Sequence, residues 1–462
     1  MLSSRRIVLV ASLLALAPAQ GQTPQPCAYG RAIAAGYKAA MLCSGMFVAG
    51  RTQAQVEATE LTGIYPQYDA IVPTLPAEVD RRHGWVQVAY DPAMPPRLSM
   101  WSPAAGCTTY EPGMVPPPLV GDTLPLAYTP PSLRPDPRAW PLGDAGVTPR
   151  PSPPLSRALA AAFDARSYGE RYRTTGVVVV RDGVVVAERY ADGFGAFVPN
   201  RTWSVAKSIT GTLMGIAQAD VLARADVPEW GCGGVPAGGC IPLRANITLD
   251  QLLRMASGLH SPTAGNRTDD IYFGGMAVTA QATSWPLATR PGTRFRYANN
   301  DTLLAMRSLR ATLGEERYRF FPEVELFRPL GMTRTTAEKD AAGNYILSSQ
   351  VWSTARDLAR LGQFWLQDGV WQGRRLLPEG WVKYMTTPSG PQPADGPGYG
   401  ATLWLFGPKQ GLPAGSYAAQ GNRGQYIMVV PSERLVVVRR GEDPGSARFD
   451  IAHFTADLIA AR

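Results

Sequence analysis

An apolar, helical stretch of the chain begins with Trp203-Ser204-Val205-Ala206-Lys207-Ser208. A serine hydroxyl is a weak nucleophile at neutral pH and needs a base within hydrogen-bond reach. Residues three apart share one face of a helix, so Lys207 can lie beside Ser204. The first turn also offers unpaired N–H groups, which favour a developing oxyanion and a deprotonated lysine. Taken alone, the motif is more typical of an N-cap serine followed by a solvated lysine.

Several further motifs follow in order along the chain. They are Ile247-Thr248-Leu249-Asp250-Gln251-Leu252-Leu253, Ser257-Gly258-Leu259, Pro291-Gly292, Tyr297-Ala298-Asn299 and Gly421-Asn422-Arg423-Gly424-Gln425. In this order and at these separations, residues 151 to 462 resemble the serine β-lactamase/penicillin-binding-protein family. Within that family, the chain is most similar to the branch of β-lactamase-related serine hydrolases that includes class C-like esterases and 6-aminohexanoate-dimer hydrolase.

The resemblance implies acyl transfer through a covalent acyl-enzyme. Ser204 attacks a carbonyl, and Lys207 must be neutral part of the time, which burial beside other donors would favour. Tyr297 projects toward this pair in the resembled family and acts as base or proton relay. Asn299 would hold the lysine or a substrate amide. The alternative for Tyr297 is a core tyrosine with a satisfied hydroxyl, and the alternative for Asn299 is a turn-forming asparagine.

The expected oxyanion hole consists of two backbone N–H groups. One belongs to Ser204, and the resemblance places the other at the strand edge near Gly421 and Asn422; the alternative there is a plain strand-entry loop. The family carries Lys or His, then Thr or Ser, then Gly on this strand, where this chain has Ala419-Gln420-Gly421. Arg423 is either a substitute cation or a solvated loop residue. The departure counts against β-lactam hydrolysis and D-alanyl peptidase activity, and it leaves esters and linear amides open.

A Ser-His-Asp mechanism finds little support. The histidines are His83, His260 and His453, and no Gly-x-Ser-x-Gly elbow occurs. His260 follows an expected helix end, which favours a capping or surface role. Trp203 is interpreted as a packing residue. Tyr272 is interpreted as a loop aromatic, and the alternative is a tyrosine over the substrate, as in the nylon-dimer hydrolases.

Residues 1–19 have the pattern of a secretory signal. Arg5 and Arg6 precede an apolar core from Ile7 to Ala17, and Ala17-Pro18-Ala19 forms a small-residue cleavage site. The apolar core is too short for a stable membrane anchor. We therefore expect a periplasmic or secreted protein. A lipoprotein modified at Cys27 is disfavoured because Gln25 and Pro26 precede that cysteine. The net charge of +8 is scattered, so no nucleic-acid footprint is expected.

Export makes disulfides plausible, and the chain has 5 cysteines. Cys232 and Cys240 bracket a Gly-rich stretch and are predicted to pair. A helix over residues 28–43 would hold Cys27 and Cys43 roughly 24 Å apart, too far for a bond. Cys43–Cys107 is the preferred second bridge, and Cys27–Cys107 is the alternative. No pair has Cys-x-x-Cys spacing and no histidine cluster accompanies them, so no metal site and no cofactor are predicted.

The chain divides into an N-terminal module over 27–111, a proline-rich linker over 112–154, and a hydrolase domain over 155–462. In the module we expect a helix over 32–46 and strands over 85–90 and 97–101, with no assigned chemistry. The linker contains Pro116-Pro117-Pro118 and is expected to be extended backbone that lies over the catalytic domain or joins the module to it.

The hydrolase domain has strand signals at both ends and helical sequence between them. A helix is expected over 155–166 and another over 447–461. Asp182-Gly183 joins two valine runs in one predicted hairpin, and residues 426–430 and 435–439 form a second. This order predicts an α+β fold: an antiparallel sheet flanked by helices, with an inserted all-helical subdomain. The resembled family has the same fold.

These observations predict an exported serine hydrolase that cleaves a small-molecule ester or amide through Ser204, Lys207 and Tyr297. The alternative enzyme is a β-lactamase or D-alanyl-D-alanine carboxypeptidase. The alternative from another class is a non-catalytic envelope binding protein on the same fold. The joint presence of Ser204, Lys207, Tyr297 and Asn299 counts against a decayed enzyme.

Overall fold

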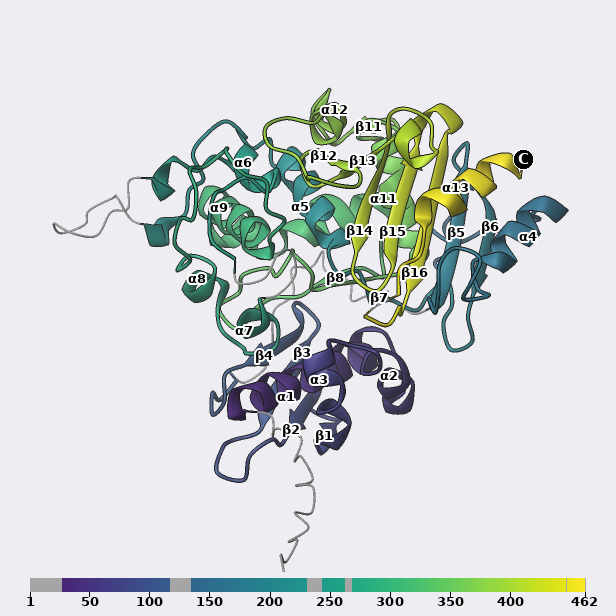
Figure 1. Cartoon of the computed structure of the whole chain (residues 1–462). Helices are drawn as coiled ribbons and strands as arrows, with labels where there is room; N and C mark the ends of the chain where they lie inside the picture. Colours follow the sequence, from purple (N-terminus) through teal and green to yellow (C-terminus); the bar gives the residue numbers. More distant parts are fainter. Residues whose placement is uncertain (1–26, 117–133, 231–242, 262–267, 446, 462) are drawn as a thin grey trace, which may run out of the picture.

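The structure is a computed structural model, and it describes residues 27–116, 134–230, 243–261, 268–445 and 447–461. Two parts are visible in Figure 1: the N-terminal module, drawn in purple, and a larger α+β domain beside it. None of the helices in these ranges is long and apolar enough to cross a membrane.

The described part of the larger domain is centred on a seven-stranded antiparallel sheet in the order β12-β13-β14-β15-β16-β5-β6. Its strands are β5 (Thr174–Arg181), β6 (Val184–Tyr190), β12 (Gly398–Tyr399), β13 (Trp404–Phe406), β14 (Ser416–Gly421), β15 (Gln425–Val430) and β16 (Leu435–Gly441). Both predicted hairpins are confirmed. Asp182 and Gly183 have φ values of 50° and 81°, as a tight two-residue hairpin turn requires. β5 pairs with β16, which brings the early and late strands of the domain together.

Helices cover both faces of this sheet (Figure 1). α5 (Val205–Ile216) and α11 (Ala355–Leu366) pack on one face, and α4 (Pro153–Ala161) and α13 (Ile451–Ala460) pack on the other. The valines of β5 alternate between the two cores, as strand periodicity requires. The predicted terminal helices of the domain are confirmed with shorter bounds, since α4 ends at Ala161 and α13 begins at Ile451, where Asp450 caps it.

A mainly helical region lies beside one end of the sheet and confirms the predicted inserted subdomain. Its helices are α6 (Leu249–Leu253), α7 (Asp269–Tyr272), α8 (Val278–Gln281), α9 (Asn299–Tyr318) and α10 (Arg328–Leu330). The smaller elements are β7 (Asn200–Arg201), β8 (Thr336–Ala337), β9 (Val351–Ser353), β10 (Val370–Trp371), β11 (Arg374–Arg375) and α12 (Trp381–Thr386). α6 begins with a capping box between Thr248 and Gln251, which explains why the Ile-Thr-Leu-Asp-Gln motif starts a helix there.

The N-terminal module consists of a long helix against a four-stranded antiparallel sheet. Its elements are α1 (Ala28–Cys43), α2 (Gln53–Thr59), α3 (Pro66–Asp69), β1 (Ala77–Asp80), β2 (Trp85–Val88), β3 (Arg97–Ser102) and β4 (Gly106–Tyr110). The predicted helix and both predicted strands are present. α1 begins four residues earlier than expected, because the Cys27 side chain caps it by accepting from the Gly30 N–H.

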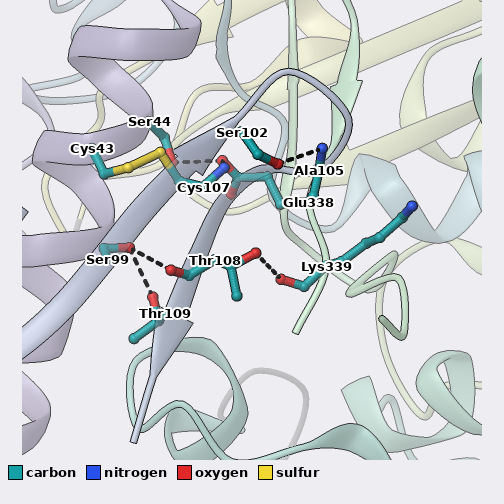
Figure 2. The surroundings of a disulfide bond; sticks show 10 residues. All are labelled: Cys43, Ser44, Ser99, Ser102, Ala105, Cys107, Thr108, Thr109, Glu338 and Lys339. Atoms are coloured by element: carbon teal, nitrogen blue, oxygen red, sulfur yellow. Dashed lines mark hydrogen bonds between the residues drawn. A yellow bond between two sulfur atoms is a disulfide. The ribbon is translucent and has the colours of Figure 1, made fainter. Parts of the chain in front are cut away.

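The predicted Cys43–Cys107 disulfide is confirmed and joins the end of α1 to β4 (Figure 2). Cys27 is free and exposed, so the alternative Cys27–Cys107 pairing is wrong. α1 lies between Cys27 and Cys43, and these two cysteines do not pair, as its length predicted. The predicted Cys232–Cys240 bridge lies outside the described residues. Beside the observed disulfide, the buried Glu338 of the larger domain accepts hydrogen bonds from Ser44 Oγ at 2.6 Å and from the Cys107 N–H at 3.2 Å.

The module is packed directly on the larger domain. A Cβ atom added to Gly36 on α1 would lie 1.8 Å from the Phe273 carbonyl oxygen, so only glycine permits this approach. Arg97 donates to the same carbonyl at 2.8 Å, and Thr108 Oγ1 donates to the Lys339 carbonyl at 3.2 Å. These buried contacts hold the module in one orientation.

The described end of the proline-rich segment also lies on the larger domain. Asp144 accepts from Arg334 at 2.8 Å and lies 3.3 Å from Arg356 and 3.5 Å from Arg360. Trp140 Nε1 donates to the Gly183 carbonyl at 2.8 Å. Residues 134–152 are therefore held by specific polar contacts.

Removal of the Cys43–Cys107 bridge is expected to destabilise the protein. The bond closes a segment with a sequence separation of 64, and a cross-link of that span contributes about 4 kcal/mol through the entropy of the unfolded chain. We expect a Cys43→Ala/Cys107→Ala variant to unfold at a lower urea concentration than wild type under non-reducing conditions. Cys27→Ala, at a free and exposed cysteine, is the matched control and should unfold like wild type. Equal midpoints for both variants would contradict the prediction.

Candidate active site

Ser204 lies at a sharp bend between β7 and α5. The Thr202 N–H donates to the Val351 carbonyl of β9 at 2.7 Å, which fixes the entry to the bend. Trp203 has a φ of +51°, a left-handed conformation that is unfavourable for a bulky side chain. The guanidinium of Arg201 packs 3.7 Å above the Trp203 ring and holds it in place. As a result Ser204 precedes the first turn of α5 and remains partly exposed while its neighbours are buried.

Lys207 lies one turn into α5 with its amine buried. Its Nζ atom is 3.0 Å from Ser204 Oγ, and it donates to Asn299 Oδ1 at 2.6 Å and to the Ser348 carbonyl at 2.9 Å. A neutral amine has two hydrogens and one lone pair. Because Asn299 and Ser348 accept the two hydrogens, the lone pair of the neutral form is directed at the Ser204 hydroxyl.

Burial also favours the neutral form of this lysine. Desolvation lowers the pKa of Lys207 to about 7, although the negative charge of Asp301 raises this pKa in part. Asp301 is itself buried, and desolvation raises its pKa to about 7, although a hydrogen bond from Ser257 Oγ at 2.8 Å favours the carboxylate. A substantial fraction of Lys207 is therefore unprotonated near neutral pH.

Tyr297 faces the same pair. Lys207 Nζ lies 5.0 Å from the centre of the Tyr297 ring, and the ring packs against Trp404 at 5.4 Å between centroids. Burial raises the pKa of Tyr297, and a hydrogen bond with the Ser204 side chain lowers it in part. The net direction of the pKa is upward, so the phenol is protonated at neutral pH and has a proton to donate.

The edge of β14 lies against Ser204. A Cβ atom on Gly421 would be 2.4 Å from the Thr202 carbonyl oxygen and 3.1 Å from the Ser204 nitrogen, so this approach requires glycine. Asn422 follows in the turn between β14 and β15. Among the described residues, neither the Ser204 N–H nor the Asn422 N–H makes a backbone hydrogen bond. Both donors are thus available to an oxyanion.

Arg423 fills neither of its two expected roles. It is buried, donates to Glu442 Oε2 at 2.9 Å, and also donates to the carbonyls of Gly63 at 3.0 Å and Thr59 at 2.9 Å. Its guanidinium is neither a substitute cation for the cleft nor a solvated loop group. It anchors the β14–β15 turn to the N-terminal module. The partners come from a distant part of the chain, so no local pattern could reveal them.

Three residues of the candidate site were not predicted. Ser348 supplies the carbonyl that accepts from Lys207, Asp301 is the buried charge near it, and Arg448 is an exposed cation that lines the cleft. Asp301 alone has a sequence signal, because it follows the Tyr297-Ala298-Asn299 motif on the same helix.

Tyr272 is not a loop aromatic, and it does not line the Ser204 cleft. It lies on α7, is buried, and shares a hydrogen bond with Ser348 Oγ. Trp203 is buried as predicted. His260 is exposed beside Trp285, while His83 pairs with Asp80 and His453 packs against Tyr168. None of these histidines lines the Ser204 cleft.

The cleft at Ser204 has a volume of about 370 Å³. Tyr297 and Trp404 line one side, and the turn from Gln420 to Gly424 lines another. In the described part of the chain, no group of three or more His, Cys, Asp or Glu side chains is placed to hold a metal ion.

Comparisons with solved structures identify the same fold in several proteins. A protein from Bacillus anthracis assigned as a 6-aminohexanoate-dimer hydrolase is 23% identical over 62% of this chain and 78% of its own, with a TM-score of 0.51. A family VIII carboxylesterase is 16% identical over 68% of this chain and 98% of its own, with a TM-score of 0.51. A penicillin-binding protein homologue from Caulobacter crescentus is 18% identical over 68% of this chain and 98% of its own, with a TM-score of 0.51.

The comparison with curated proteins finds no match to this chain. The family model described as Beta-lactamase matches residues 159–462. This range includes every residue that lines the Ser204 cleft. The match covers well over half of the chain, and the chain therefore belongs to the Beta-lactamase family.

Proposed function

We propose that this protein is an exported serine hydrolase that cleaves ester or amide bonds through an acyl-enzyme on Ser204. Membership of the Beta-lactamase family indicates a hydrolase. The observation that carries the finer proposal is the buried Lys207 amine, 3.0 Å from Ser204 Oγ, with its two other contacts to Asn299 and Ser348. This arrangement supplies the base that a serine nucleophile needs.

In the first half-reaction, Ser204 Oγ bonds to the substrate carbonyl carbon and its proton passes to Lys207. The Ser204 and Asn422 N–H groups stabilise the oxyanion. The bond to the leaving alcohol or amine then breaks, and the Tyr297 hydroxyl protonates the leaving group while Lys207 returns a proton to Tyr297. Water next attacks the acyl-enzyme by the same steps in reverse, which releases the acid and restores Ser204.

The preference for esters and linear amides rests on the strand edge beside the cleft, where this chain lacks the Lys or His that the family carries. The strand edge of the cleft presents Gln420 and Gly421, and the Arg423 guanidinium is bound to Glu442 and to module carbonyls. A β-lactam or a peptide carboxylate would therefore lack the charged partner that the family places on this strand, and the one exposed cation among the lining residues, Arg448, comes from the segment after β16. The β-lactamase and D-alanyl-D-alanine carboxypeptidase alternatives are weaker for this reason.

Export is part of the proposal and rests on two observations. Residues 1–19 have the pattern of a secretory signal. The Cys43–Cys107 disulfide fits an oxidising compartment, where such bonds form and persist.

Ser204 is expected to react with a generic fluorophosphonate probe. Intact-mass spectrometry should show one adduct on wild type and none on Ser204→Ala. Ser208→Ala is the matched control, because Ser208 is buried on the same helix and its hydroxyl donates to the Thr402 carbonyl; this variant should keep the adduct. A well-folded wild type without an adduct would contradict the proposal and favour the binding-protein alternative.

The pH dependence of hydrolysis should follow Lys207. Since its pKa is lowered to about 7, kcat/KM for a small ester is expected to rise with pH and level off above neutrality. Asp301→Asn removes the negative charge that raises this pKa, so the midpoint of the profile should move to lower pH. Lys207→Ala should lose about 10²- to 10⁴-fold in kcat/KM. A midpoint that Asp301→Asn leaves unchanged would argue against Lys207 as the base.

The enzyme alternatives separate with two further substrates. We expect a chromogenic cephalosporin to be hydrolysed far more slowly than a small ester. Rapid cephalosporin turnover that is lost in Ser204→Ala would instead indicate a β-lactamase. Stable acylation by penicillin without turnover would indicate a penicillin-binding protein.

A further inference from the structure

A second cavity of about 660 Å³ lies beside the Ser204 cleft, where the N-terminal module meets the larger domain. Ile64, Tyr65 and Pro66 line it from the module, and Trp203 and Asn422 line it from the larger domain. We call this cavity the module pocket. Its walls come from two parts of the chain that only the fold brings together.

The module pocket and the Ser204 cleft adjoin each other. Asn422, Arg423, Pro444 and Arg448 line both spaces. Asn422 also carries one of the two N–H groups available to an oxyanion. A substrate whose carbonyl lies at Ser204 can therefore pass over the β14–β15 turn and place a distant group in the module pocket.

The lining of the module pocket is mixed: Tyr65, Ile64 and two prolines form an apolar wall, and Asp69, Asn422 and Arg448 add polar groups. The Tyr65 ring meets the Trp203 ring edge-on at 6.1 Å between centroids, and it meets the Tyr37 ring in the same manner at 6.4 Å. Tyr37 and Trp203 are buried, so Tyr65 is the ring that this wall exposes to the pocket. A partly exposed ring beside Ile64 and two prolines favours another aromatic ring or an apolar chain.

The module pocket is preformed in the described structure. Asp69 Oδ1 accepts from the backbone N–H groups of Gly63 at 3.0 Å and Ile64 at 3.3 Å, which fixes the loop that carries Tyr65. Arg423 donates to the Gly63 carbonyl at 3.0 Å and ties the same loop to the turn at Asn422. The two walls are therefore held at a defined spacing, and binding need not order them.

We infer that the module pocket binds an aromatic or apolar group of the substrate at a distance from the scissile bond, so that the N-terminal module forms part of the substrate-binding site. This inference rests on the proposed serine hydrolase function. It gives the module a role in specificity and assigns the substrate class: esters or amides that carry a phenyl or similar apolar group on one side of the carbonyl.

The test compares a small ester with two extended esters in a pH-stat assay, so that no aromatic reporter group is present. Ethyl acetate is the small ester. Ethyl 4-phenylbutanoate carries the ring on the acyl side, and 4-phenylbutyl acetate carries it on the alcohol side. We expect at least one extended ester to exceed ethyl acetate in kcat/KM by about tenfold, the discrimination that a modest apolar contact provides.

One variant fills the module pocket without touching the reacting groups. Ala70 is exposed and lines the pocket, so Ala70→Trp should fill it while the protein still folds. This variant should abolish the tenfold preference through an increased KM and leave ethyl acetate hydrolysis within about twofold of wild type. Ala160→Trp is the matched control, because Ala160 is an exposed residue of α4 on the opposite face of the sheet; it should retain the preference.

The outcomes separate the inference from the function on which it rests. Two results would overturn the module pocket as a substrate site in a protein that hydrolyses ethyl acetate and forms the Ser204 adduct. One is the absence of a preference for either extended ester, and the other is a preference that Ala70→Trp leaves unchanged. An equal loss of the preference for the extended ester in Ala70→Trp and Ala160→Trp would also overturn this inference. Failure of wild type to hydrolyse any ester or to form the adduct would overturn the proposed function itself.

Discussion

The buried amine of Lys207 is the constraint on which the arrangement of the larger domain depends. An ammonium group is costly to remove from water, and here the amine is satisfied by groups from three separate elements. α5 supplies Ser204, α9 supplies Asn299, and the segment before β9 supplies the Ser348 carbonyl. A shift of α9 or of the segment before β9 would leave a buried donor without an acceptor. One side chain therefore links α5, α9 and the segment before β9.

The parts of the fold that sequence predicts are those that local chemistry decides. The β5–β6 hairpin follows from two valine runs around Asp182-Gly183. The absence of a Cys27–Cys43 bond follows from the length of one helix, which separates the two cysteines. The pairing of Ser204 and Lys207 follows from their spacing on α5. The first two depend on one short stretch of chain each, whereas the catalytic interpretation of Ser204 and Lys207 also depends on the motifs that follow them.

The parts that sequence does not predict depend on contacts between distant segments. β7, β8 and β9 have two or three residues each, too few for a periodic signal. Arg423 stands in a turn beside the cleft, where a free cation would be expected, but its partners Thr59 and Gly63 belong to the module. The carbonyl of Ser348 is a backbone group, which no side-chain motif can mark.

The bend at Trp203 connects the nucleophile to the module. A positive φ in a tryptophan is tolerated only when the surroundings fix it, and here Arg201 stacks on one face of the ring while Tyr65 meets it edge-on. Tyr65 belongs to the module, and its loop is bonded through Arg423 to the turn that carries Asn422. The module thus touches both ends of the candidate oxyanion hole, the Ser204 bend and the β14–β15 turn. A segment without catalytic residues of its own is in this way placed to support the position of the nucleophile and to line the space where a substrate would extend.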